Sequence, residues 1–300
     1  MRGASPLLPL AAATAFLTRV PVGRFVEIDG RAVARAAPFY PLVGAVVGGL
    51  AGAVVDVLAG PLPAWAAATT GVGLAALLTG GMHLDALADT ADALGGGTRQ
   101  RRLEIMRDHS IGSFGAVALV LVLLLEISLL AELGARDLAL VSFAAAGALS
   151  RWSALPIALA LPYARDDGQG RSLATGISLA AVLLGLAVAA GIAALALGSG
   201  AAAALGAAVG VALVLGLFYR RWLGGFTGDA LGAATALSQT ACLIAAYAER
   251  SPPERPIGPA SARSGSATTP TSAGWFPRRC GRTLAGPDLN RRGALRGEHR

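Results

Sequence analysis

Residues 114–133 read FGAVALVLVLLLEISLLAEL, an apolar run in which Glu126 and Glu132 are the only charged residues. A helix rises about 1.5 Å per residue, so about twenty residues cross the roughly 30 Å hydrocarbon core of a bilayer. The run therefore predicts a transmembrane helix. An ionised side chain inside such a helix is costly unless it faces protein or water. We expect Glu132 to lie at a membrane interface, whereas Glu126, further inside, is the more costly of the two.

The same apolar character extends over most of the chain. Hydrophobic residues make up 54% of the 300 residues and charged residues 14%, against about 25% charged residues in soluble domains. We therefore predict an all-α fold, a polytopic integral membrane helical bundle surrounded by membrane lipid. A soluble enzyme, a disulfide scaffold and a disordered chain are excluded as descriptions of the whole. About seven transmembrane helices are expected, near residues 39–60, 62–80, 114–133, 138–160, 177–197, 200–219 and 230–248.

The net charge of +7 lies almost entirely in the C-terminal segment. Residues 249–300 hold ten Arg and four acidic residues, a net charge of +6, which leaves +1 for residues 1–248. A nucleic-acid partner is therefore not expected, since the membrane body lacks a basic surface. Residues 251–256 read SPPERP, and Ser, Thr, Gly and Ala follow, a composition typical of disorder. We predict a membrane-embedded domain at 1–248 and a disordered tail at 249–300 without a catalytic role.

Arginine distribution predicts the orientation of the bundle. Twelve Arg lie in the connections on one side, and Arg136 alone lies in those on the other. The positive-inside rule assigns the first set to the cytoplasm, so we expect a multi-pass inner-membrane protein with its polar motifs facing the cytoplasm. These connections are residues 19–38, 81–113, 161–176 and 220–229. Seven spans would place the Arg-rich tail on the outer side, which conflicts with the positive-inside rule. Three explanations stay open: one segment is re-entrant, the N-terminal stretch also crosses the membrane, or the tail does not influence the orientation.

Small residues recur along the first long span. Gly44, Gly48 and Gly52 are four residues apart and share one face of a helix. Such a stripe lets two backbones approach closely inside a membrane. We expect it to serve ordinary helix packing.

An acidic cluster follows the second predicted span, where residues 78–97 read LTGGMHLDALADTADALGGG. On a helix, Asp89 lies about 40° to one side of Asp85 and Asp92 about 20° to the other side of Asp85, so the three carboxylates share one face. No Lys or Arg lies between Gly80 and Thr98 to relieve their repulsion. A solvated amphipathic helix is the alternative, but unrelieved carboxylates favour a hard divalent cation. We predict Mg²⁺ bound by Asp85, Asp89 and Asp92.

Three further residues are candidates for contact with substrate. His83 would lie about 160° from Asp85, off the acidic face, where it could position substrate, transfer a proton or be merely structural. Arg107 lies between an apolar turn and Asp108 and is suited to binding phosphate oxygens. Asp229, in GGFTGDALGA at residues 224–233, either interacts with the dipole at a helix start or makes a second metal or phosphate contact.

Several motifs together closely resemble the cobalamin synthase family, whose members are adenosylcobinamide-GDP ribazoletransferases. The resemblance runs from about residue 10 to residue 248 in the family's order. Two departures are Ala86 and Ala93, where the family usually has Gly, and a third is the order His109-Ser110, which weakens any role for His109. The motifs are FLTRVP at 16–21, FYPLVG at 39–44, GGMHLD at 80–85, LADTAD at 87–92, IMRD at 105–108, IGSFG at 111–115, TGD at 227–229 and LGA at 231–233.

The resemblance implies a reaction between adenosylcobinamide-GDP and α-ribazole or its 5′-phosphate, which gives adenosylcobalamin or its 5′-phosphate and releases GMP. It implies that Mg²⁺, held by the three aspartates of the acidic cluster, binds the diphosphate. Arg19, Arg107 and Asp108 would then bind substrate, and Asp229 would be a further ligand or would orient the ribazole. The general base is one of the aspartates or His83, and the number of subunits stays open.

Two other functions compete with this interpretation. A CDP-alcohol phosphotransferase carries a motif that ends in Gly-x3-Asp-x3-Asp, which Gly81, Asp85 and Asp89 reproduce, but the upstream half of that motif has no counterpart before Gly81. A cation-coupled transporter would place its ion site near the bilayer midplane, whereas the sequence places these acids at one membrane face. Lipid head-group transfer therefore ranks second and transport third.

Overall fold

The computed structural model describes residues 8–22, 30–108, 110–165 and 176–250. Within these ranges the fold is all-α, as predicted, and the only extended pairing is an isolated bridge between Tyr163 and Phe226. Seven short helical elements of the described chain accompany the long helices. Four are α-helices, α1 (Leu8–Leu17), α2 (Gly30–Ala36), α5 (Met82–Asp92) and α6 (Arg99–Ile105), and three are 3-10 turns, η2 (Ala37–Phe39), η3 (Ala93–Gly95) and η4 (Gly198–Gly200). The predicted tail lies outside the described residues, apart from Glu249 and Arg250.

Seven long helices coincide with the seven predicted spans. They are α3 (Tyr40–Leu58), α4 (Ala64–Thr79), α7 (Ser113–Gly134), α8 (Ala139–Ala160), α10 (Leu179–Leu197), α11 (Ala201–Trp222) and α12 (Gly228–Arg250). Five helical stretches of the described chain are long and apolar enough to cross a membrane. Helix α4 passes the same test only together with the α5–η3 segment, at an angle of 89°, which is the geometry of a broken span or a re-entrant loop. One of the five, 44 residues long, contains both α10 and α11. Gly198, at a φ of 60°, starts the turn that separates these two helices.

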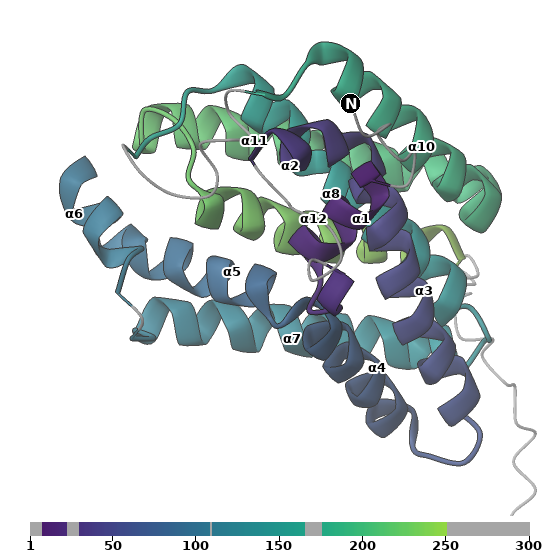
Figure 1. Ribbon diagram of the computed structural model, residues 1–300. Helices are drawn as coiled ribbons and strands as arrows, with labels where there is room; N and C mark the ends of the chain where they lie inside the picture. The colour runs from purple at the N-terminus through teal and green to yellow at the C-terminus, as the bar shows by residue number, and fades with distance from the viewer. Residues whose placement is uncertain (1–7, 23–29, 109, 166–175, 251–300) are drawn as a thin grey trace, which may run out of the picture. The chain divides into compact units, whose positions relative to one another are not determined.

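Helix α8 is the central element of the bundle (Figure 1). It packs against α3, α10, α11 and α12, and most of its side chains are buried, including the polar Ser142, Ser150 and Ser153. The outer helices instead expose apolar side chains such as Leu121 and Leu195. Because lipid tails are as apolar as these side chains, such a surface suits a bilayer. The polar residues of the bundle therefore collect around α8.

The glycine stripe of α3 forms the closest helix contact in the bundle. A Cβ on Gly44, Gly48 or Gly52 would collide with the backbone of α8. The same holds in reverse for Gly147 of α8, which faces Gly44. The close contact predicted from the spacing of small residues is confirmed, and it fixes α3 against the most buried helix.

Asp56 near the end of α3 stabilises the start of α8. Its Oδ1 accepts a hydrogen bond from the backbone N–H of Ala139 at 2.9 Å, and its Oδ2 accepts one from Leu140 at 2.9 Å. The first amides of a helix have no partner within the helix, and a carboxylate there also interacts favourably with the helix dipole. A charge close to the membrane is thus neutralised by the helix that it caps.

Replacing Gly48 by alanine should destabilise the protein by about 1–3 kcal/mol, the usual cost of overpacking a tight contact. The added methyl group would lie 2.8 Å from the backbone carbon of Phe143, which cannot move without shifting α8. Gly49→Ala is the matched control, since its Cβ would meet only the methyl group of Ala144 at 3.6 Å. Thermal unfolding in detergent compares the two variants. Equal losses of stability would contradict the role of the stripe.

Candidate functional site

The candidate site begins at the break between α4 and α5. Gly80 and Gly81 have φ values of 67° and 69°, a left-handed backbone that favours glycine. Together they turn the chain by 89°. Arg19 lies directly over this break: its backbone N–H donates to the carbonyl of Leu78 at 2.7 Å, and its side chain occupies the space that a Cβ on Gly80 would need.

Helix α5 runs alongside α7 (Figure 1), and α4, which bends away from α5 at their junction, also packs against α7. Leu87 is buried in a small apolar cluster with Val122 of α7 and with Ala233 and Ala236 of α12. Because Leu87 lies opposite the acidic face of α5, this packing decides where the acidic face points. Asp85 is exposed and Asp89 is half-buried.

Asp92, the third carboxylate of the predicted metal site, holds the start of α7. Its Oδ2 accepts from the N–H of Gly112 at 2.8 Å, and its Oδ1 accepts from the N–H of Gly115 at 2.8 Å. Both oxygens are therefore engaged with backbone amides. The carboxylates of Asp85 and Asp89, by contrast, form no hydrogen bond or ion pair with another described residue. The structure thus separates a structural aspartate from two aspartates that are available to a ligand.

Three acidic neighbours surround Asp89. Burial is the main cause that raises the pKa of Asp89; Asp85, Asp229 and Asp92 raise it further, and Arg165 opposes them. Within the described ranges no three His, Cys, Asp or Glu side chains converge closely enough to enclose a metal ion by themselves. Mg²⁺ commonly binds through one or two carboxylates and completes its shell with water and substrate phosphates. Asp85 and Asp89 fit that requirement, whereas a three-aspartate cage would have to recruit Asp92 from its amides.

Asp229 forms an ion pair that the sequence did not predict. Arg165 Nη2 lies 2.8 Å from Asp229 Oδ2, and both side chains are largely buried, with exposed fractions of 12% and 24%. Two backbone hydrogen bonds bring the loops together, because Ala164 donates to Phe226 at 2.8 Å and Phe226 donates to Pro162 at 3.0 Å. The start of α12 is therefore joined to the segment that follows α8.

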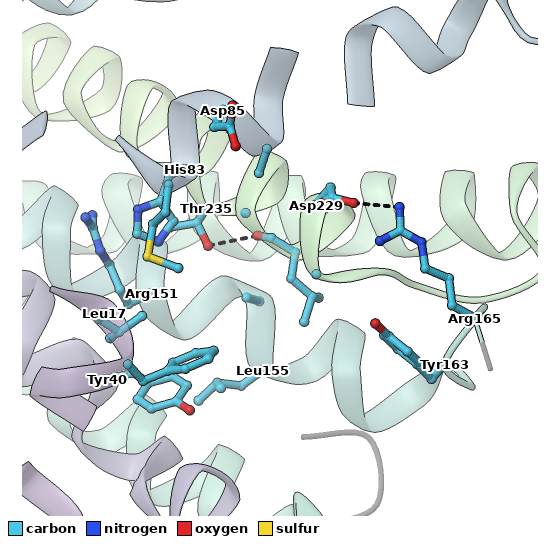
Figure 2. A pocket seen from close by; sticks show the side chains of 17 residues that line it. Leu17, Tyr40, His83, Asp85, Arg151, Leu155, Tyr163, Arg165, Asp229 and Thr235 are labelled. Atoms are coloured by element: carbon cyan, nitrogen blue, oxygen red, sulfur yellow. Dashed lines mark hydrogen bonds and ion pairs between the residues drawn. The ribbon is translucent and has the colours of Figure 1, made fainter. Parts of the chain in front are cut away.

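A cavity of about 320 Å³ lies beside these residues. Figure 2 shows Asp229 and Arg165 at one end of it, with Arg151 and His83 at the other. Of the residues predicted from the sequence, His83, Asp85 and Asp229 line this cavity; Arg151 and Arg165 were not predicted. Its apolar and aromatic walls come from α1, α3, α8 and the segment after α8, through Phe16, Leu17, Tyr40, Ala154, Leu155 and Tyr163.

The arginine-rich helix α6 is attached to the end of α11. Arg99 Nε donates to the carbonyl of Leu223 at 2.6 Å, and Arg102 Nη1 donates to the carbonyl of Trp222 at 2.9 Å. Cations are favourable at these terminal carbonyls because the helix dipole is negative there. Arg107 and Asp108 follow α6, are exposed and do not line the cavity. The structure does not bring Arg107 and Asp108 to the cavity wall, and their contact with substrate stays a prediction.

Comparison with known proteins identifies the family. The family model described as cobalamin-5-phosphate synthase matches residues 9–247. The chain belongs to this family. That range includes every residue that lines the cavity, so the family resemblance and the candidate site concern the same part of the molecule.

Curated relatives agree with the family assignment. A protein of Shewanella woodyi named adenosylcobinamide-GDP ribazoletransferase is 37% identical over 246 residues, covering 77% of this chain and 92% of the relative. One of Shewanella piezotolerans with the same name is 36% identical over 237 residues, with the same coverage of 77% and 92%. No solved structure matches the chain at a comparable level. The resemblance to the cobalamin synthase family is thereby confirmed.

Replacing Asp92 by alanine should lower stability by about 1–2 kcal/mol, because two amides at the start of α7 lose their acceptor. Asp89→Ala, one turn earlier, is the matched control, and its stability should be unchanged or higher because repulsion is relieved. Thermal unfolding in detergent without divalent cations compares the two. A greater loss of stability in the Asp89 variant would contradict the division into structural and available aspartates.

Proposed function

We propose that this chain is an adenosylcobinamide-GDP ribazoletransferase that works at the cavity beside α5 and α12. The observation that carries the proposal is Asp85, which lines the cavity of a member of this family and whose carboxylate has no partner among the described residues, with Asp89 one turn further along α5. Transfer of a substituted phosphate group needs neutralisation of negative charge at the diphosphate and a group that accepts a proton. The cavity supplies carboxylates, a histidine and two arginines in one place.

In this proposal a hydroxyl oxygen of α-ribazole, or of its 5′-phosphate, attacks the cobinamide-linked phosphorus of adenosylcobinamide-GDP. A new P–O bond forms, the P–O bond to GMP breaks, and the pair of electrons leaves with GMP. The hydroxyl proton passes to a nearby aspartate or to His83. Products are adenosylcobalamin, or its 5′-phosphate, and GMP, so atoms and charge balance without an oxidant or reductant.

The residues of the cavity divide these tasks. Asp85 and Asp89 would hold Mg²⁺, which supplies charge neutralisation and orientation at the diphosphate when it is bound. Asp229 holds the Arg165 side chain by the ion pair at 2.8 Å, so the guanidinium is oriented for a phosphate oxygen. Arg19 lies over the break that starts α5 and is placed to neutralise a second phosphate oxygen.

The same proposal places the reaction at the cytoplasmic face of an inner membrane. Arg165 of the cavity lies in one of the arginine-rich connections, and the start of α12 follows another. The positive-inside rule favours the cytoplasmic side for both. Membrane lipid would surround the exposed apolar faces of the outer helices.

The decisive experiment incubates purified, detergent-solubilised protein with adenosylcobinamide-GDP and α-ribazole, with either Mg²⁺ or EDTA. We expect GMP and a complete cobamide in equal amounts with Mg²⁺ and neither product with EDTA, because the diphosphate charge is then unneutralised. Mass spectrometry of the corrinoid and chromatography of GMP measure the two products. A folded, lipid-supplied sample without turnover would remove this function and make CDP-alcohol substrates the next to test.

Single replacements Asp85→Asn and Asp89→Asn should each lower kcat by at least about 100-fold, since each removes a negative ligand while keeping the side-chain volume. Glu104→Gln is the matched control, because Glu104 is an exposed acid on α6 whose ion-pair partner is Arg101 rather than a cavity residue. Steady-state rates of GMP release measure the effect. Wild-type kcat in both aspartate variants would show that neither takes part.

A further inference from the structure

A buried polar cluster lies inside the bundle, next to the cavity, and the reaction as proposed makes no use of it. Arg151 is 6% exposed and Glu126 is 3% exposed. Both lie near the middle of long helices, α8 and α7, together with Gln239 near the middle of α12. Charged side chains at such depth are costly and usually mark a functional site. The question is what this arginine does.

The hydrogen bonds of the cluster run in one direction, from Arg151 to Glu126. Arg151 Nη1 donates to the amide oxygen of Gln239 and to Ser150 Oγ. The amide nitrogen of Gln239 donates to both carboxylate oxygens of Glu126, at 3.2 and 3.3 Å. Thr240 Oγ1 adds a third donor to Glu126 at 2.9 Å. The carboxylate is therefore satisfied without direct contact with the guanidinium.

The absence of a direct pair argues against a purely structural counter-ion. Among the described residues Arg151 forms no ion pair within 4.0 Å of a carboxylate, and Gln239 lies between the two charges. The free-energy cost of burying an arginine is usually offset by direct, bidentate contact with an acid. Here Gln239 separates Glu126 from Arg151, so the guanidinium can still bind another anion.

The aliphatic part of Arg151 is fixed from the side of α3. A Cβ on Gly44 would lie 2.7 Å from Arg151 Cδ, so only glycine leaves room for the side chain there. Three elements thus determine where the guanidinium lies: α3 through Gly44, α12 through Gln239 and α8 itself. A group held this firmly is preorganised for binding.

The side chain of Arg151 lines the cavity at the end where His83 lies. All hydrogen bonds of Arg151 to described residues leave from Nη1, so Nε and Nη2 have donors to spare. Arg151 lines the 320 Å³ cavity and also a smaller one of about 40 Å³, which Glu126 and Gln239 border. Figure 2 shows its guanidinium beside the ring of His83, at the end of the large cavity away from Asp229.

We propose that Arg151 forms an anion subsite at this end of the cavity, which binds a phosphate group of a substrate, and that Gln239 and Glu126 position it. The inference rests on the proposed function for its substrates. Guanidinium groups match phosphate oxygens in geometry and charge. The acidic wall at Asp85 and Asp229 repels a phosphate that has no cation, so the Arg151 end is where such a group binds unaided. The phosphate is either the 5′-phosphate of the acceptor or part of the diphosphate of the donor.

Kinetic constants of Arg151→Lys and Arg151→Met identify which phosphate is bound. We expect KM to rise about tenfold or more in the Met variant, and less in the Lys variant, for one phosphate-bearing substrate. A rise for α-ribazole 5′-phosphate but not for α-ribazole assigns the subsite to the acceptor. A rise for adenosylcobinamide-GDP with either acceptor assigns it to the donor. Unchanged KM values for all three substrates would overturn the subsite.

Gln239→Leu tests the positioning role without removing the guanidinium. The variant should raise the same KM as Arg151→Met, by a smaller factor, because Arg151 loses the acceptor that orients it. Ser238→Ala, at the neighbouring buried position of α12, is the matched control and should leave KM unchanged. If Arg151→Met does not fold, the Lys and Gln239 variants decide between the same outcomes. A Gln239→Leu variant that lowers kcat and leaves KM unchanged would contradict the role of Gln239 in positioning Arg151.

A binding measurement separates failure of the subsite from failure of the proposed function. Inorganic pyrophosphate, without Mg²⁺, should raise the melting temperature of the wild-type protein in detergent and have no effect on Arg151→Met. If the wild type shows this shift but no turnover, the subsite stands and the transferase assignment fails. If the wild type turns over substrate and the shift is equal in both proteins, the assignment stands and the subsite is wrong.

Discussion

The two left-handed glycines between α4 and α5 are the constraint on which the site depends. Gly80 and Gly81 turn the chain by 89° and end the apolar helix at the point where the acidic one begins. Without this turn the aspartates of α5 would continue along α4 into the apolar part of the bundle. With it, α5 lies between α7 and α12, with Leu87 packed against both helices and Asp85 lining the cavity.

Charges inside the bundle are stabilised in three ways, and the differences between them identify function. Asp56 and Asp92 each cap a helix to which they do not belong, with both oxygens bound to backbone amides. Glu126 is surrounded by neutral donors, and Asp229 has an arginine partner. The carboxylates of Asp85, which is exposed, and Asp89, which is half-buried, have no such partner among the described residues. In a medium that penalises unpaired charge, carboxylates without partners are those expected to meet a ligand.

The cavity has an uneven distribution of charge that suits two different phosphate-bearing substrates. Carboxylates on α5 and at the start of α12 form one wall, and Arg151 lies at the other end. A cation is needed before a phosphate can approach the first wall, whereas the second needs none. Aromatic side chains from α1 and α3, with Phe16 and Tyr40 stacked at 5.6 Å, add an apolar surface to the cavity.

The sequence by itself determined the helices, the acidic face of α5 and the family. Apolar length predicts spans because the bilayer thickness fixes the number of residues that cross it, and the spacing of Asp85, Asp89 and Asp92 follows from helix geometry alone. The tertiary structure decided the partners. Three features depend on contacts between residues 20 to 88 positions apart: the capping of α7 by Asp92, the pairing of Arg165 with Asp229 and the position of Arg151 at the cavity. Such contacts have no local periodicity, because they arise from the packing of one helix against another, so only the folded bundle reveals them.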